Sequence, residues 1–284
     1  KIHSPLRRQR EMWIRDRDKT MPQLRPMYLG DLRKVIEIIE SHDDDDAESA
    51  AADFEDGDFF NQYVLEKDDT VIGVTGFRSV EGTDNTCWLS WTYLNGENQG
   101  CGLGRGMLMD LLAKLRDINC RKIFVKVSDY KEEGEVGIYE RALKVYQSLG
   151  FEEEVVNKHF YDKGENQMIL GLSLREVGDE AVDEDTKVEE EKPIIRFNGI
   201  HEIAETDGAY TFSWEVMPTK RFFGKRNFTV EDLMIGSEES KDGGGRKVFL
   251  TFPSNLPLIH NPLQSAGFKY CGQLSDYYEE GVHE

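Results

Sequence analysis

The stretch that most constrains the fold of this chain is a glycine-rich loop between an apolar run and a helical pattern. The loop reads Gln99-Gly100-Cys101-Gly102-Leu103-Gly104-Arg105-Gly106 and follows the aromatic, apolar run 87–94. After it, apolar residues recur at helical spacing (Leu108, Leu111, Leu112, Leu115 and Ile118). A strand, a glycine loop and a helix in this order are typical of an anion site, because glycines let a ligand approach the backbone and the first helical turn offers free N–H groups.

Two well-known phosphate loops do not fit these residues. The Walker pattern ends in Gly-Lys-Ser/Thr, whereas Gly104 is followed by Arg105 and Gly106. The Rossmann pattern is matched only loosely, and it requires an early parallel strand–helix–strand unit, whereas three or four strands precede this loop. The alternative without a ligand is a tight strand-to-helix turn.

The loop does match the pattern Gln/Arg-x-x-Gly-x-Gly/Ala, through Gln99, Gly102 and Gly104. This pattern resembles the acetyl-CoA pyrophosphate loop of the GNAT family of N-acetyltransferases. The opening of the first expected strand and helix, residues 24–39, also looks like that family. The resemblance predicts acetyl-CoA as the acyl donor.

A second match lies in the helix expected over 135–149. The family signature Asn-x-x-Ala-x-x-x-Tyr-x-x-x-Gly-Phe is met by Ala142, Tyr146, Gly150 and Phe151 at matching intervals. Tyr139 occupies the Asn position and departs from the pattern, which affects the usual hydrogen bond to the pantetheine arm.

The order of expected elements agrees with the resemblance. Short polar turns separate the early strands, so we expect antiparallel neighbours, whereas the strand after the loop helix should run parallel to the strand before the loop. The expected strands are 24–27, 59–66, 71–80, 86–94, 121–127, 155–161 and 167–174. The predicted fold class is α/β (α+β): a GNAT fold with a mixed, mostly antiparallel sheet, a splayed parallel pair and flanking helices, plus a smaller C-terminal α+β domain.

The resemblance assigns roles to particular residues. Tyr146 is the expected general acid, because a phenol stays protonated at neutral pH and can donate to a leaving thiolate; a core tyrosine is the alternative. The general base is open between Glu97, Asp129, Glu81 and a water chain. The expected acetyl-CoA contacts are Tyr93 and Leu94 through the main chain, then Gln99, Gly100, Cys101, Gly102, Leu103, Gly104, Arg105 and Tyr139.

Four segments are expected along the chain. Residues 1–22 form a basic arm, 23–174 the acetyltransferase domain, 175–192 an acidic linker and 193–284 a C-terminal domain. Within the second segment, the resemblance implies that residues 42–58 wall the acceptor side. Their like charges are expected to make this loop mobile unless a cation binds it, and a solvated loop without a ligand is the alternative.

The C-terminal domain contains a short sequence repeat of the first domain. Arg121-Lys122-x-Phe124 recurs as Arg246-Lys247-x-Phe249, and Gly150-Phe151 recurs as Gly267-Phe268. We therefore expect a degenerate, catalytically inactive GNAT-like half in which residues 243–245 replace the phosphate loop. It is expected to pack against the first sheet, to cover part of the acceptor cleft, or to form a homodimer contact.

Charge limits the partners. The net charge is −20, with 55 acidic against 35 basic residues, so nucleic acid is not expected as a ligand. A cationic acceptor is compatible with this charge, although acidity also serves solubility alone. No apolar run predicts a membrane span, the cysteines are expected to be free thiols in the cytoplasm, and no metal site is predicted.

These observations predict an acetyl-CoA-dependent N-acetyltransferase that moves an acetyl group to a primary amine of a cationic small molecule or peptide by direct transfer. The alternative from another class is a non-catalytic acyl-CoA sensor or interaction module on the same fold. The Tyr139 departure and the degenerate second half favour that alternative.

Overall fold

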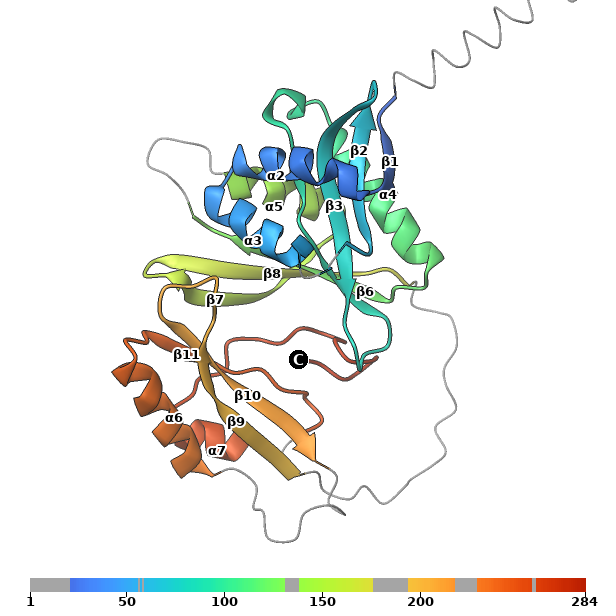
Figure 1. The fold of residues 1–284 in the computed structure, drawn as a ribbon. Coiled ribbons are helices and arrows are strands. Elements are labelled where there is room, and N and C mark those ends of the chain that lie inside the picture. The colour runs from blue at the N-terminus through green and yellow to red at the C-terminus, as the bar shows by residue number, and fades with distance from the viewer. Residues whose placement is uncertain are drawn as a thin grey trace, which may run out of the picture. The chain divides into compact units, whose positions relative to one another are not determined.

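The computed structural model describes residues 21–55, 57, 59–130, 138–175, 194–217, 229–256 and 259–284. The predicted basic arm and acidic linker lie almost wholly outside these residues. The chain divides into two compact units (Figure 1). The first comprises residues 1–125, 141–151 and 172–175, and the second comprises 126–140, 152–171 and 176–284. Within the described ranges, no helix has the length and apolar character needed to cross a membrane.

The first unit is built on antiparallel strands that end in a parallel pair. The strands are β1 (Gln23–Pro26), β2 (Gln62–Lys67), β3 (Thr70–Ser79), β4 (Thr86–Leu89) and the start of β6 (Lys122–Ser128). Neighbours from β1 to β4 are antiparallel, whereas β4 and β6 are parallel, with Thr86 opposite Lys122. The helix α4 (Leu103–Asp117) connects this pair, so the predicted parallel pairing is confirmed.

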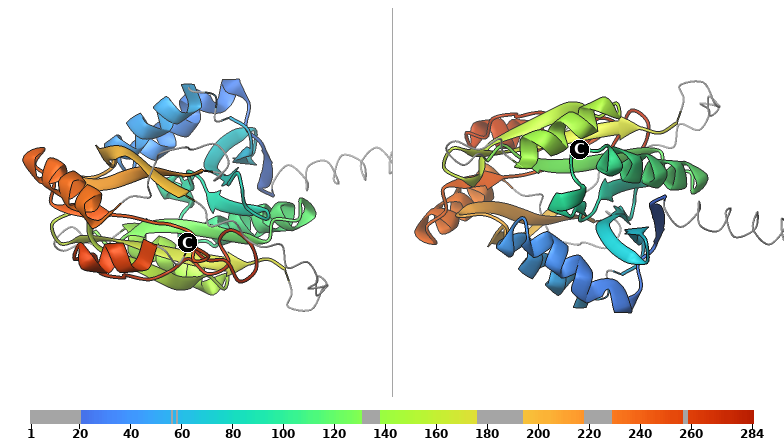
Figure 2. Two further views of the ribbon diagram at one scale, coloured as in Figure 1. Left: turned by 90° about the horizontal axis from the view of Figure 1, so that it is seen from below. Right: turned by 90° about the horizontal axis from the view of Figure 1, so that it is seen from above.

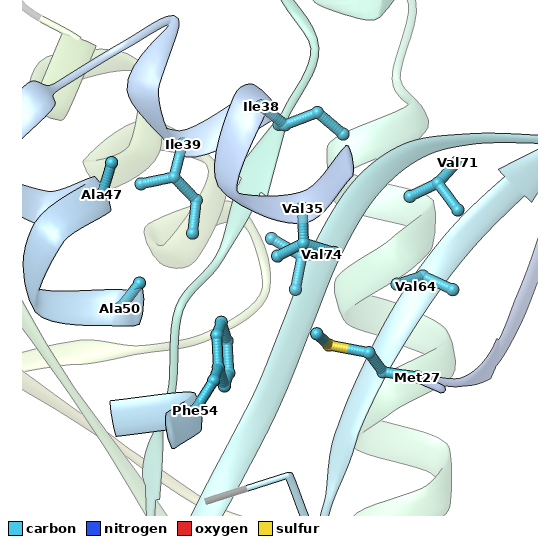
Figure 3. Packing of buried hydrophobic residues seen from close by; sticks show 10 residues of the cluster. All are labelled: Met27, Val35, Ile38, Ile39, Ala47, Ala50, Phe54, Val64, Val71 and Val74. Carbon is cyan, nitrogen blue, oxygen red and sulfur yellow. The ribbon is translucent and has the colours of Figure 1, made fainter. Parts of the chain in front are cut away.

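Alternating side chains on these strands pack against helices on both faces of the sheet. Val64 and Val74 pack against α2 (Leu32–Glu40) and α3 (Asp44–Glu55), as Figure 3 shows. Leu65 and Ile72 instead pack with Met107 of α4. Figure 2 shows α2 and α3 in blue on one side of the strands and α4 in green on the other. On β2 the neighbours Val64 and Leu65 face opposite core layers. On β3 a β-bulge at Ile72, where the register shifts between Leu65 and Glu66, places Ile72 and Val74 in different layers although they are two residues apart.

The predicted single strand 86–94 is wrong, because the structure has two short strands there. β4 ends at Leu89, opposite Phe77, and β5 (Tyr93–Leu94) resumes with Tyr93 opposite Val74. Four steps along one strand therefore match three steps along β3, which defines a β-bulge at residues 90–92. In the described part of the chain, β5 pairs only with β3, whereas β4 also pairs with β6.

The predicted mobile acidic loop is also wrong, because residues 44–55 form the helix α3. Its three first-turn aspartates lie where the helix dipole favours negative charge. Its opposite face buries Ala47, Ala50 and Phe54 against α2 and the sheet. Local charge repulsion is therefore outweighed by the alanine content and by the burial of one helix face.

The second unit contains a hairpin and a small three-stranded sheet. The hairpin is β7 (Glu152–Asp162) with β8 (Glu165–Ser173), and the sheet order is β11 (Lys247–Phe249), β10 (Ala209–Met217), β9 (Ile194–Glu202). The helices α6 (Val230–Asp242) and α7 (His260–Ser265) accompany this sheet. Phe212, Leu233 and Ile259 lie in its buried core.

Residues of the C-terminal segment bind the strand β7 directly. Arg246 donates to the carbonyl oxygens of His159 at 3.1 Å and Tyr161 at 3.2 Å. The ring of Phe249 lies 5.2 Å from that of Phe160, and the C-terminal segment also forms a backbone bridge to β7 at Val155. These contacts lie within the second unit and hold its C-terminal segment against β7.

The two Gly-Phe pairs of the internal repeat have the same local backbone geometry, whereas residues 243–245 do not match the glycine loop. After α5 (Ile138–Ser148), Gly150 has φ +94° and the Phe151 N–H bonds the Tyr146 carbonyl at 3.1 Å. After α7, Gly267 has φ +88° and the Phe268 N–H makes the equivalent bond at 3.0 Å. Both are helix C-terminal caps that need a left-handed residue. Residues 243–245 follow the C-terminus of α6, so they do not replace a loop at a helix N-terminus as predicted.

Candidate active site

The glycine loop forms an open cradle of backbone at the start of α4. Gly100 and Gly102 have φ values of +77° and +86°, and no atom lies within 4 Å of a Cβ built on either residue. Gly102 is the N-cap of α4. Among the described residues, no acceptor is found for the backbone N–H groups of residues 100–105. The site therefore has the free donors, the space and the positive helix end that a pyrophosphate requires.

The residues around this loop are largely exposed. Arg105 lies in the first turn of α4, with its guanidinium 3.0 Å from the Met109 sulfur. Cys101 donates its thiol to the Asn98 carbonyl, and Leu103 and Gly104 are half-buried. An exposed guanidinium one turn from free N–H groups can add a charge-assisted bond to a phosphate.

Gln99 joins three segments of the first unit. Its amide Nε2 donates to the Leu94 carbonyl at 3.1 Å, and its Oε1 accepts from Arg141 of α5 at 3.5 Å. The Leu94 carbonyl also accepts from His42 Nε2 at 2.8 Å. The end of β5, the glycine loop, the turn after α2 and the helix α5 therefore meet at Gln99 and Leu94.

Two aromatic–carboxylate pairs fix α3 against the strand that carries Leu94. Trp91 Nε1 donates to Asp53 at 2.9 Å, and the Tyr93 hydroxyl donates to Asp46. Arg78 of β3 binds the same Asp53 carboxylate at 2.5 Å. Asp46 and Asp53 are seven residues apart in α3, so they lie on the same face of this helix and both pairs bind that face.

Asp46 is the most perturbed carboxylate of this region. Burial raises its pKa above the usual range, the hydrogen bond from Tyr93 opposes this shift, and the negative charges of Asp43 and Asp45 add to the rise. The acidic surface and the β5 segment thus meet at one partly buried carboxylate.

Tyr146 lies in α5 with its side chain buried, and its ring makes an edge contact with Phe151 at 5.5 Å. Burial raises the pKa of its phenol well above the usual value, so the phenol is protonated at every physiological pH. No described residue forms a hydrogen bond with its hydroxyl, so the core packing leaves this donor available.

The structure also places the candidate general bases and Tyr139. Glu97 is exposed in the 3₁₀ turn 96–98, where only its backbone N–H is engaged, with Asn95 Oδ1 at 3.1 Å. Asp129 binds the backbone and side-chain amides of Asn166, and Glu81 lies in an exposed turn. Tyr139 is half-buried in the first turn of α5. No hydrogen bond or ion pair among the described residues connects the Glu97 carboxylate with Gln99 or Tyr146.

Residues 42–58 were expected beside the acceptor, but no sequence pattern singled out His42 or Asp46 within them. The signal for Asp46 was its seven-residue spacing from Asp53, which places both on one helix face only if the segment is helical. His42 gave no spacing signal, because its partner is a backbone carbonyl 52 positions away. No group of three potential metal-binding side chains occurs among the described residues, and the four cysteines are free.

Comparison with known proteins identifies the class of the first domain. Residues 22–151 match the model of the acetyltransferase (GNAT) family, so this segment is an acetyltransferase domain of that family, with acetyl-CoA as its donor. No curated protein matches the chain.

Three solved structures that match part of this chain are named as acetyltransferases. A putative GNAT acetyltransferase from Desulfovibrio desulfuricans is 22% identical over 55% of this chain and 100% of its own, with a TM-score of 0.47. The ribosomal-protein-S18-alanine N-acetyltransferase from Escherichia coli is 19% identical over 57% of this chain and 100% of its own, with a TM-score of 0.46. An aminoglycoside 6'-N-acetyltransferase complexed with coenzyme A is 10% identical over 55% of this chain and 99% of its own, with a TM-score of 0.48.

Proposed function

We propose that this protein transfers an acetyl group directly from acetyl-CoA to a primary amine of a cationic small molecule or peptide. The observation that carries the proposal is the row of free backbone N–H groups at residues 100–105, at the positive end of α4. That row is where the pyrophosphate would bind. Acetyl-CoA supplies an activated thioester, so the protein needs to hold the thioester beside a nucleophilic amine.

The β-bulge at residues 90–92 provides the place for the thioester. Because β5 pairs only with β3 among the described strands, and because the Leu94 carbonyl already accepts from His42 and Gln99, the proposed contacts are the main-chain N–H groups of Tyr93 and Leu94. These groups would position the acetyl carbonyl and the pantetheine arm. Backbone dipoles fixed in advance stabilise a developing oxyanion without reorganisation.

A cationic acceptor follows from the charges beside this strand. The carboxylates of Asp43, Asp45 and Asp46 lie at the start of α3, and Tyr93 connects Asp46 with β5. A negative wall at this position raises the local concentration of cations. An exposed pair of unit charges is worth only about 0–1 kcal/mol, so recruitment rather than tight binding is its contribution.

Tyr146 is the proposed general acid. Its pKa lies above that of an ordinary thiol, about 8.5, so complete proton transfer from the phenol to a thiolate is uphill. The phenol therefore acts mainly by donating a strong hydrogen bond to sulfur as negative charge develops there. A phenylalanine at this position would keep the packing against Phe151 and lose only this donor.

The test is release of CoA thiol with a panel of polyamines, aminoglycosides and basic peptides. We expect amine-dependent release, a decrease in kcat of about 10²-fold or more in Tyr146→Phe, and unchanged acetyl-CoA affinity. Tyr28→Phe is the matched control, because that side chain is 62% exposed. Absence of both acetyl-CoA binding and thiol release across the panel would disprove the function.

A further inference from the structure

We propose that His42 is the general base of this acetyl transfer, with Nδ1 of its imidazole accepting a proton from the acceptor ammonium. The inference rests on the proposed function and adds the one catalytic group that the sequence left open. It assigns the acceptor side of the reaction to the turn between α2 and α3.

The hydrogen bonds of His42 fix its tautomer. A carbonyl oxygen only accepts, so the 2.8 Å contact between Nε2 and the Leu94 oxygen requires the proton on Nε2. The neutral ring then has its lone pair on Nδ1, and no described residue bonds that atom. The Gln99 amide nitrogen lies 3.4 Å from Nε2 but donates to the same carbonyl, so it leaves this assignment unchanged.

Two further contacts hold the ring in place. The Tyr93 ring lies 5.7 Å from the imidazole, at an interplanar angle of 31°, and Asp46 fixes the Tyr93 hydroxyl. The His42 backbone N–H also bonds the Ile39 carbonyl at 2.8 Å, at the end of α2. Asp46 and Tyr93 are therefore positioning residues, whereas His42 is the group proposed to touch the substrate.

The position of His42 suits a base for this reaction. Its ring lies against Leu94, in the two-residue strand proposed to hold the acetyl carbonyl. The titratable groups around it are Tyr93 of β5, Asp43 in the adjoining turn and Asp46 of α3, which binds Tyr93. On the loop side, Arg141 of α5 donates to Gln99 at 3.5 Å. The carboxylates stabilise the imidazolium that forms when the base accepts a proton.

The chemistry requires such a base. An alkylamine with a pKa near 10.4 is neutral in only about one molecule per thousand at pH 7.4. Imidazole is the side chain whose charge changes close to neutral pH, so it can both accept this proton and release it to water.

The transfer moves two protons away from the acceptor nitrogen and exchanges one C–S bond for one C–N bond. His42 takes one proton from R–NH₃⁺, and the nitrogen lone pair then forms the C–N bond at the acetyl carbonyl while the C–S bond breaks. The nitrogen loses two protons in total. One ends on the CoA sulfur and the other is released to water, which leaves R–NH–COCH₃, CoA–SH and H⁺.

The experiment compares wild type with His42→Gln, in which the amide NH₂ can still donate to Leu94. The wild-type profile of kcat/KM against pH should show a limb that rises with pH, because the base must be deprotonated to accept a proton. In His42→Gln this limb should disappear, and kcat/KM at pH 7 should fall by about 10²- to 10⁴-fold. Acetyl-CoA affinity, measured by calorimetry, should stay within about threefold. His201→Gln, on an exposed residue of the second unit, is the control.

A weakly basic aromatic amine separates a base from a merely structural histidine. This amine is already neutral at pH 7, so its acetylation should lose much less activity in His42→Gln than that of an alkylamine. Equal losses for both amines, or an unchanged pH limb in His42→Gln, would overturn the assignment while the proposed function stands. If the wild type acetylates no amine, the proposed function fails and the assignment of His42 fails with it.

Discussion

The sharpest test of the donor cradle is Gly102→Ala. Gly102 has φ +86° and ψ −1° and caps α4, and no atom lies within 4 Å of the methyl group that alanine would add. The cost of the substitution is therefore conformational, about 1–2 kcal/mol for an L-residue in the left-handed region. A domain of this size should lose about 2–8 °C in Tm.

Gly102→Ala should also weaken acetyl-CoA binding, for the same conformational reason. If alanine lets the free loop relax to negative φ, acetyl-CoA must restore the strained conformation, and its Kd should rise by about 5- to 30-fold, as 1.4 kcal/mol corresponds to tenfold. Calorimetric titration and thermal unfolding measure the two effects. Gly106→Ala is the control, because Gly106 lies inside α4, without positive φ and with equal space; it should stabilise by about 0.5–1 kcal/mol. Binding by Gly102→Ala within twofold of wild type would refute the cradle.

Three other substitutions test the surroundings of the site. The pKa of Asp31 is lowered mainly by a hydrogen bond from Arg25. Arg25→Gln should therefore lower the free energy of unfolding, measured by denaturant titration, by about 1 kcal/mol at pH 7. This loss should shrink as the pH falls below about 4, because the carboxyl protonates there. Asp46 has its pKa raised by burial, so the stability of the protein falls as pH rises above the unfolded value near 4. Asp46→Asn should therefore raise the free energy of unfolding at pH 7, and this gain should vanish near pH 4. It should be absent in the exposed control Asp44→Asn. Arg246→Ala removes hydrogen bonds to two β7 carbonyls and should lower the free energy of unfolding by about 1–2 kcal/mol. Hydrogen exchange should become faster in β7, and unchanged exchange there would contradict this role of Arg246.

The parts of the fold that were predictable depend on local patterns. The helix α4 and the strands around it follow from hydrophobic periodicity and polar turns, and the parallel pairing of β4 with β6 follows from the connecting helix. The end of α5 was predictable because Gly150 must adopt a left-handed conformation there. In each case the determining residues are close together in the sequence.

The wrong predictions concern elements that depend on contacts between residues far apart in the sequence. The helix at residues 44–55 is stabilised by burial of one face and by the pairs of Asp46 with Tyr93 and Asp53 with Trp91. These pairs span 47 and 38 positions, and no local pattern predicts such contacts. The bulge after Leu89 likewise depends on its register against β3. The site residue His42 was missed because its orientation depends on the carbonyl of a strand that follows the bulge.

The bulge also determines where the length of this chain can change. Deleting one residue from 90–92 would keep Tyr93 opposite Val74 but remove the bulge, so β5 would continue β4 in a one-to-one register with β3 and lose the irregular segment that separates the two strands. A deletion in the exposed turn 81–85 changes no register. Insertions and deletions among related sequences should therefore accumulate at 81–85 and be excluded from 90–92, even though both segments lack regular pairing.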